Sequence, residues 1–140
     1  MRKFGVLFLY LACMTILVNA GENSERNLGI RKFVSPDYPN VARLAQISGD
    51  VHILATVTAQ GRVTVADIMS GPPILASYAQ KNLLTWEFTV QSQVEKLEIV
   101  YRYRLTEPKV YGQVVPSVTL VSPTEVSIVS NFPLPTGHPE

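Results

Sequence analysis

The clearest pattern in the chain is a strict alternation of apolar and polar positions between residues 96 and 105. Every second position is apolar: Leu97, Ile99, Tyr101, Tyr103 and Leu105. The positions between them are mostly charged: Lys96, Glu98, Val100, Arg102 and Arg104. A strand with one apolar and one charged face is typical of a sheet that helices cover on one side only. The pattern therefore predicts a long strand over residues 96–105.

Two earlier runs predict a β-hairpin. Residues 51–58 alternate in the same way, with apolar side chains at Val51, Ile53, Ala55 and Val57. A three-residue turn, Ala59-Gln60-Gly61, follows and places a glycine where a positive φ is wanted. The alternation resumes at Val63 and continues in the opposite phase from Ala66, which predicts a bulge near Ala66.

Apolar residues at helical spacing predict two helices. The first follows Tyr38-Pro39, with Val41, Leu44 and Ala45 on its apolar face and Gly49 as its C-terminal cap. The second is predicted over residues 74–85, after Gly71-Pro72-Pro73. Its apolar face is predicted to hold Leu75, Tyr78, Ala79, Leu83 and Trp86, and its polar side Ala76, Gln80, Lys81 and Thr85.

The first twenty residues have the layout of a secretory signal peptide. A short basic region, Arg2-Lys3, precedes the uncharged run Phe4–Val18, and Val18-Asn19-Ala20 offers small residues before a cleavage point. Residues 1–20 are therefore predicted to be a signal peptide and residues 21–36 a flexible lead-in. An uncleaved anchor is the alternative, because the stretch from Phe4 to Gly21 carries no charge and is about as long as a membrane span requires. A lipoprotein modified at Cys13 is a third interpretation.

The C-terminal segment, residues 107–140, is rich in proline and carries two β-rich runs. Six of the ten prolines follow Glu107, and the runs cover residues 114–121 and 124–129. Because prolines flank both runs, each is predicted to be an edge strand or an extended segment. Two arrangements stay open for the second run: it lies along the strand at 96–105, or it forms an extended arm.

Composition narrows the class of protein. A length of 140 residues fits one domain, and a net charge of +1 gives no basic excess for a nucleic-acid partner. One cysteine and two histidines disfavour a metal site, and no cofactor is predicted. No Ser/His/Asp order, phosphate loop or carboxylate pair suggests a mechanism, so the chain is predicted not to be an enzyme and has no candidate catalytic residue. His52 is interpreted as a solvated or hydrogen-bonded residue.

Short motifs between Tyr38 and Leu105 resemble, in order and spacing, the TonB C-terminal domain family. They correspond to its "YP…AR…G-x-V", hairpin and "SG…L…A…W-x-F" elements. The residues that carry the resemblance are Tyr38, Pro39, Ala42, Gly49, Gly61, Ser70, Gly71, Leu75, Ala79, Trp86 and Phe88. The resemblance implies an α+β fold over residues 37–106, a three-stranded antiparallel sheet with two helices packed on one face. These motif residues are expected to be structural, with Trp86, Phe88, Tyr101 and Tyr103 in the core.

The resemblance also implies a function in the cell envelope. Such domains act in transmembrane transport by gripping an extended peptide, the TonB box, of an outer-membrane transporter through strand addition. In the family geometry the accepting edge is the third strand, which here means Leu97, Glu98, Ile99, Val100, Tyr101, Arg102 and Tyr103. The chain is therefore expected to be an exported, periplasmic protein-binding module, with membrane contact only if residues 1–20 stay uncleaved.

Two features separate this chain from a full TonB energy transducer. Its apolar segment contains no histidine, and at most 17 residues with one proline separate that segment from Tyr38. That lead-in would reach roughly 60 Å when extended. Two alternatives remain beside the exported module: an anchored energy transducer, and a structural envelope protein whose edge strand is capped by its own tail.

Overall fold

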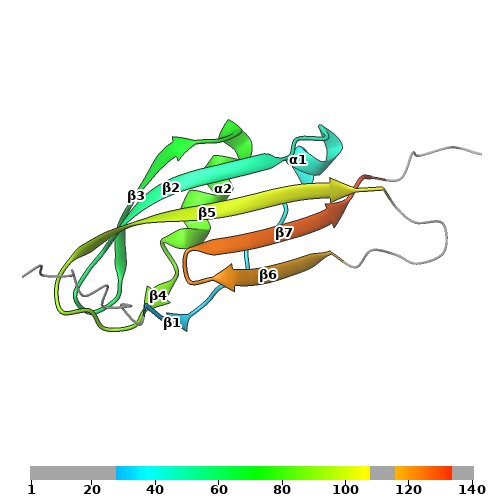
Figure 1. The fold of residues 1–140 in the computed structure, drawn as a ribbon. Coiled ribbons are helices and arrows are strands. Elements are labelled where there is room, and N and C mark those ends of the chain that lie inside the picture. Colours follow the sequence, from blue (N-terminus) through cyan, green and yellow to red (C-terminus); the bar gives the residue numbers. More distant parts are fainter. Residues whose placement is uncertain (1–27, 108–115, 134–140) are drawn as a thin grey trace, which may run out of the picture.

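The computed structural model describes residues 28–107 and 116–133 (Figure 1). Their main feature is a five-stranded sheet with the strand order β3-β2-β5-β7-β6. A second, two-stranded sheet pairs β1 with β4. The elements are β1 (Ile30–Lys32), α1 (Asn40–Leu44), β2 (Gly49–Val57), β3 (Val63–Ser70), α2 (Pro73–Leu83), β4 (Glu87–Phe88), β5 (Glu95–Thr106), β6 (Ser117–Ser122) and β7 (Glu125–Asn131).

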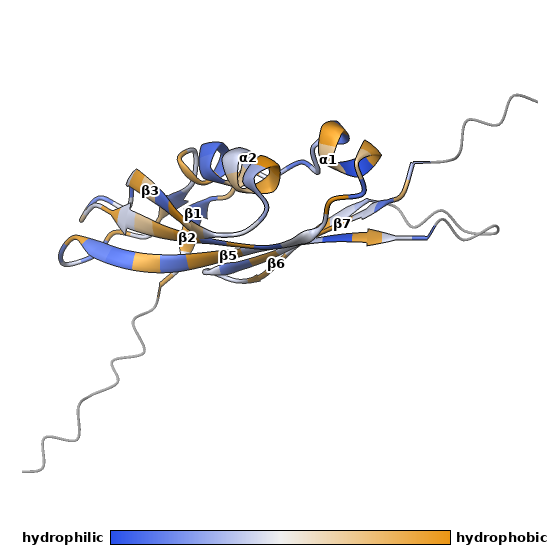
Figure 2. Cartoon of the chain, turned by 90° about the horizontal axis from the view of Figure 1, so that it is seen from above, coloured by the Kyte–Doolittle hydropathy of each residue, from blue (hydrophilic) through white to orange (hydrophobic). Residues whose placement is uncertain are grey.

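The predicted fold class is confirmed. Strands β3, β2 and β5 are antiparallel, and both helices lie on the same face of the sheet (Figure 2). The C-terminal segment adds β7, which runs parallel to β5, and β6, which runs antiparallel to β7. The sheet is therefore mixed and two strands wider than the three-stranded sheet that the resemblance implied.

Period-two alternation builds the core between the sheet and the helices. All four predicted inward residues of β2 are buried, as are Ile99, Tyr101 and Tyr103 of β5. Strand β7 adds Val126 and Ile128 to the same face. The opposite face of β5 carries the charged residues, so one face of the sheet is buried against the helices and the other is exposed to solvent.

The hairpin between β2 and β3 follows the expected turn chemistry. Gly61 has a φ of +88°, and a Cβ at this position would lie 2.0 Å from the carbonyl oxygen of Phe88. Only glycine combines that backbone conformation with so close an approach. Register shifts against β2 leave Thr64 and Met69 in β3 without a partner residue on β2. The bulge that the sequence predicted near Ala66, where apolar and polar positions exchange, therefore lies at Thr64.

The buried faces of the two helices differ from the predicted ones. In α1, Val41 and Leu44 are 56% and 62% exposed, and Ala42 is the buried residue. The helix has only five residues, so it packs one small side chain and turns away at Gln46, whose φ is 56°. Gly49, predicted to cap this helix, is instead the first residue of β2.

Helix α2 buries four residues: Leu75, Ala76, Ala79 and Leu83. Ala76 was predicted on the polar side and Tyr78 on the apolar face, yet Ala76 is buried and Tyr78 is 48% exposed. Both predictions are wrong because the helix is rotated toward its small side chains. Alanine lets the helix axis approach the sheet, whereas a tyrosine on that face would hold it away.

Part of the predicted flexible lead-in is ordered. Residues Ile30–Lys32 form β1, which pairs with β4, and the ring of Phe33 meets that of Trp86 edge-on at 4.9 Å between centroids. The polar composition of this segment concealed the pairing, because backbone groups and not side chains make a strand ladder. The prediction of a flexible lead-in is therefore wrong for Ile30–Lys32.

Each tail run was predicted to be an edge strand or an extended segment. Strand β6 is an edge strand, whereas β7 is neither, so the prediction is wrong for β7. Strand β7 lies between β5 and β6 and pairs on both sides. Pro123 and Pro133 flank β7 without interrupting it, so every residue from Glu125 to Asn131 keeps its N–H donor. A flanking proline limits the length of a strand but does not exclude it from the interior of a sheet.

Candidate peptide-binding edge

The expected binding edge is partly occupied by the chain itself. Strand β7 pairs with β5 from Val100, opposite Glu125, to Thr106, opposite Asn131. Four of the residues expected to accept a partner strand therefore already have one: Val100, Tyr101, Arg102 and Tyr103. The expectation of an open edge is wrong for them. Of the two arrangements left open for the tail, the structure has the one in which it lies along β5.

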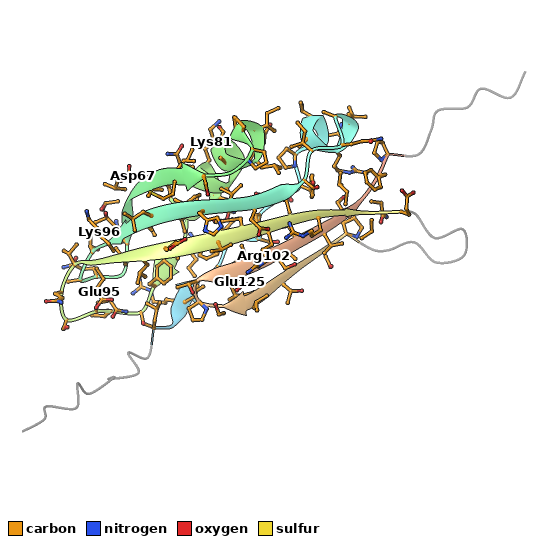
Figure 3. All side chains as sticks on the ribbon, turned by 45° about the horizontal axis from the view of Figure 1, so that its top comes forward. Asp67, Lys81, Glu95, Lys96, Arg102 and Glu125 are labelled. Atoms are coloured by element: carbon orange, nitrogen blue, oxygen red, sulfur yellow. The ribbon has the colours of Figure 1, made fainter. Side chains whose placement is uncertain are left out.

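Packing and charge both hold β7 in place. Val126 is fully buried and Ile128 is 2% exposed, so removing β7 would expose two core side chains. On the solvent face, Arg102 Nε of β5 donates to Glu125 Oε1 of β7 at 2.6 Å (Figure 3). The hydrogen bond and charge of Glu125 raise the pKa of Arg102. Strand β7 is thus a built-in part of the sheet.

The charged face of the sheet continues onto β2. Asp50 accepts hydrogen bonds from both neighbouring arginines of β5, at 3.2 Å from Arg102 and 2.7 Å from Arg104. Arg102 therefore links carboxylates on its two neighbouring strands. Solvent screens pairs as exposed as these, so they contribute little to stability and mainly fix which strands lie side by side.

The remaining part of the expected edge lies before β7 begins. Leu97, Glu98 and Ile99 pair with β2 on one side, and no strand within residues 28–107 and 116–133 pairs with them on the other. The N–H of Val100 donates to the carbonyl oxygen of Thr124 at 2.9 Å, which shows that Val100 directs its backbone groups to this outer edge. Alternate residues of a strand share that direction, so Lys96 and Glu98 also present their backbone groups there.

Side chains around this short edge are polar and exposed. Lys96 and Glu98 lie on the solvent face, near the end of β5 that Figure 3 marks with Glu95 and Lys96. The Glu98 carboxylate is 2.7 Å from Nδ1 of His52 on β2, so His52 is hydrogen-bonded, as one of its two interpretations held. Leu97 and Ile99 face the helices.

Two aromatic residues of the resemblance motifs lie in the core. Trp86 and Phe88 are 1% and 0% exposed, and Trp86 Nε1 donates to Asn82 Oδ1 at 2.8 Å and to the Val34 carbonyl at 3.1 Å. The hydroxyl of Tyr101 donates to the same Asn82 oxygen at 2.9 Å. Burial raises the pKa of Tyr101 well above its ordinary value.

Sequence reasoning missed Asn82 as the centre of this network. Its amide nitrogen also donates to the Val34 carbonyl, at 3.0 Å, so one side chain joins α2, β5 and the segment after β1. The available signal was its position four residues before Trp86, which would place both side chains on one side of the helix predicted to run to this point. Asn82 is partly buried, and polar side chains in such positions usually have hydrogen-bond partners.

Other residues of the resemblance motifs lie at turns where two backbone segments approach each other closely. Gly71 has a φ of +124°, and a Cβ there would lie 2.8 Å from the carbonyl oxygen of Asp50. The hydroxyl of Tyr38 donates to the carbonyl oxygen of Ile47, and its ring meets Tyr103 edge-on at 5.3 Å. Pro39 occupies the N-cap position of α1. These residues therefore shape the backbone that carries the edge.

The rest of the described surface has fewer features of a binding site than this edge. A hollow of about 370 Å³ lies between β3 and the connection from α2 to β4, lined by Arg62, Val63, Thr64, Leu84, Thr85, Trp86 and Glu87. A hydrogen bond from Arg31 lowers the pKa of Glu87, which keeps that carboxylate ionised. No group of three or more His, Cys, Asp or Glu side chains gathers in residues 28–107 and 116–133. None of the helices described in this structure has the length and apolar character to cross a membrane.

A sheet with both helices on one face and an aromatic core beneath them is consistent with the TonB C-terminal fold. The family described as Gram-negative bacterial TonB protein C-terminal matches residues 34–105, which are 72 of the 140 residues. The chain belongs to this family and is a TonB-like protein associated with envelope transport. No curated protein matches the chain. Strands β1, β6 and β7 lie outside the matched residues.

Proposed function

We propose that this protein is an exported, periplasmic module that binds an extended peptide segment of an outer-membrane transporter by strand addition to β5. The observation that carries the proposal is the start of β7 opposite Val100, which leaves the outer edge before Val100 without a strand among the described residues. Family membership supports envelope transport as the setting. The binding residues are then Leu97, Glu98 and Ile99, with Lys96 extending the edge.

The chemistry of the edge suits a main-chain partner. An added strand would exchange N–H and C=O hydrogen bonds with Lys96 and Glu98, whose backbone groups point outward. The edge is short, because Thr124 and β7 block its extension beyond Ile99. Few hydrogen bonds and an exposed setting favour weak, reversible binding, and the opposite charges of Lys96 and Glu98 would select the side chains of the partner.

Titration of the purified protein with a fluorescent peptide of TonB-box type tests the proposal. The informative variant is Glu98→Pro, because proline removes an outward N–H donor while leaving the bonds to β2 in place. Its matched control is Glu98→Gln, which keeps the backbone donor and changes only the charge. We expect binding by the parent and by Glu98→Gln, and at least tenfold weaker binding by Glu98→Pro. Equal binding by all three proteins would contradict strand addition at this edge.

A structural envelope role is the second candidate. It is favoured by the tail itself, since β7 occupies Val100–Tyr103 and buries Val126 and Ile128. If the parent protein is folded and binds no extended peptide, this role replaces the first. The anchored energy transducer depends on residues 1–20, which lie outside the described residues, and intact Met1 in the membrane fraction would favour it.

A further inference from the structure

The five-stranded sheet has two outer strands, β3 and β6, and only β3 is protected against pairing. Register shifts at Thr64 and Met69 interrupt the regular edge of β3. The side chain of Gln80 on α2 also donates to the carbonyl oxygen of Ala66 in β3, at 2.6 Å. Bulges and capped carbonyls are ordinary means of keeping an edge strand from pairing with another chain.

Strand β6 lacks these protections. Its sequence, Ser117–Ser122, contains no charged residue and no proline. Its one irregularity lies at Val121 beside the turn to β7, so Ser117–Leu120 is regular. Leu120 is 39% and Val121 58% exposed. Among the described residues no strand pairs with its outer side, which makes β6 an uncharged and accessible edge.

The hydrogen-bond pattern of the sheet determines which residues of β6 direct their backbone N–H and C=O groups away from β7. Because Val100 donates to Thr124, the even-numbered residues of β7 direct their backbone groups toward β5 and the odd-numbered ones toward β6. Thr119 lies opposite Ser127 in the β6–β7 pair, so Thr119 is bonded inward. The backbone N–H and C=O groups of Val118 and Leu120 therefore point away from the sheet.

We propose that the outer edge of β6 pairs with the same edge of a second copy of this chain, antiparallel and about a twofold axis at Thr119. In that register Val118 of one copy lies opposite Leu120 of the other, twice, and the two Thr119 residues face each other. The outward groups of Val118 and Leu120 then satisfy one another in two hydrogen-bonded pairs. The two sheets join into one continuous sheet, with the helices of both copies on the same side.

The chemistry of β6 favours this occupant. An isologous contact requires a surface that complements itself, and Val118-Thr119-Leu120 offers an aliphatic residue on each side of a central threonine. Val118 and Leu120 lie opposite Ile128 and Val126, on the face toward the core, so their side chains extend the apolar layer across the contact. With no charge on the strand, self-pairing brings no like charges together. The contact is small, so association is expected at high protein concentration.

Disulfide trapping in a Cys13→Ser background tests the register. At the axis, the two Thr119 residues form a pair without backbone hydrogen bonds, with Cα atoms about 4.5 Å apart, within reach of a disulfide. Thr119→Cys is therefore expected to form a covalent dimer under mild oxidation. Ser117→Cys is the matched control: it lies on the same face of β6, yet its two copies would be roughly 14 Å apart along the strands. Absence of the Thr119→Cys dimer, or equal yields from both variants, would overturn the proposal.

Sedimentation over a concentration series provides the second measurement. The parent protein is expected to shift from monomer to dimer, and Leu120→Lys to need at least a tenfold higher concentration. Val65→Lys, a similar change at an exposed site on β3, is expected to behave as the parent. A parent that stays monomeric throughout, or a Thr119→Cys variant that cross-links in cells to a different protein, would exclude the second copy as the occupant. Peptide binding at β5 is a separate readout, so either proposal can fail alone.

Discussion

Asn82 lies in the last turn of α2 and Trp86 in the connection that follows Leu83, and the indole nitrogen of Trp86 donates to the Asn82 side-chain oxygen at 2.8 Å. The same oxygen accepts the hydroxyl of Tyr101 from β5. Two aromatic side chains from different parts of the chain thus share one acceptor, so both of their polar atoms have a hydrogen-bond partner within the protein. This network holds the helix end against the strand that carries the candidate binding edge.

Replacing Trp86 by alanine is expected to lower the free energy of unfolding by about 3–5 kcal/mol, as large aromatic truncations in cores do. The indole is 1% exposed and contacts the rings of Phe33, Phe88 and Tyr101. Urea unfolding of Trp86→Ala, beside Trp86→Phe, measures the loss. The phenylalanine variant keeps most of the packing and should lose less. A melting temperature within a degree or two of the parent for Trp86→Ala would contradict the core role.

Tyr101 and Tyr103 offer a matched test of one buried hydrogen bond. Tyr101 donates to Asn82, whereas the hydroxyl of Tyr103 is buried and has no hydrogen-bond partner among the described residues. Tyr101→Phe is expected to cost about 1 kcal/mol, because it leaves Asn82 short of a donor. Tyr103→Phe is expected to be neutral or stabilising by about 1 kcal/mol, because it removes a hydroxyl that is desolvated without compensation. Chemical unfolding of both variants measures the difference, and equal losses would contradict it.

The two tyrosines also predict how stability changes with alkaline pH. Burial raises both pKa values above their ordinary value of about 10. A raised folded-state pKa contributes stability that is fully present below pH ~10 and is lost as the pH rises above it, because the unfolded chain releases these protons first. The protein is expected to unfold at alkaline pH, with the tyrosinate absorbance of Tyr101 and Tyr103 appearing together with the loss of structure. Tyrosinate formation by both residues in a still-folded protein would contradict the prediction.

The tail strand is expected to stabilise the domain by packing more than by charge. Ile128→Ala on β7 should cost about 2–5 kcal/mol, since its side chain is 2% exposed in the core. Glu125→Gln removes the charge paired with Arg102 on the exposed face and should cost no more than about 1 kcal/mol. Thermal unfolding of the two variants ranks the effects. The reverse ranking would mean that the ion pair, and not the core, holds β7.

Export is a prediction that concerns residues outside the described ones. From the basic start, the apolar run and Val18-Asn19-Ala20, we expect the exported protein to begin near Gly21. N-terminal sequencing of the protein from the periplasmic fraction measures the cleavage point. Its control is Ala20→Lys, which should block cleavage by placing a charge at the small-residue position. Recovery of the parent with Met1 intact in the membrane would contradict the prediction.

The sequence predicted the central part of the fold because local periodicity reports which face of an element is buried. Alternation at Val51–Val57 and over residues 96–105 predicted β2, β5 and their inward residues, and Gly61 predicted the turn between β2 and β3. The helix faces were less predictable. Whether Ala76 or Tyr78 of α2 faces the sheet depends on the distance between the layers, and hydrophobicity alone does not report that distance.

The sequence by itself determined the class of fold, the family and the aromatic core, because spacing and turn residues act over a few positions along the chain. Beyond the β2–β3 hairpin, only the tertiary structure decided which strands are neighbours. Strand β7 joins β5 although 18 residues lie between Thr106 and Glu125, and β1 joins β4 across more than half the domain. Strand pairing is made by backbone groups that every residue carries, so side-chain patterns leave it open. The candidate site is therefore shorter than the sequence predicted, because the strand that closes most of it comes from the tail of the same chain.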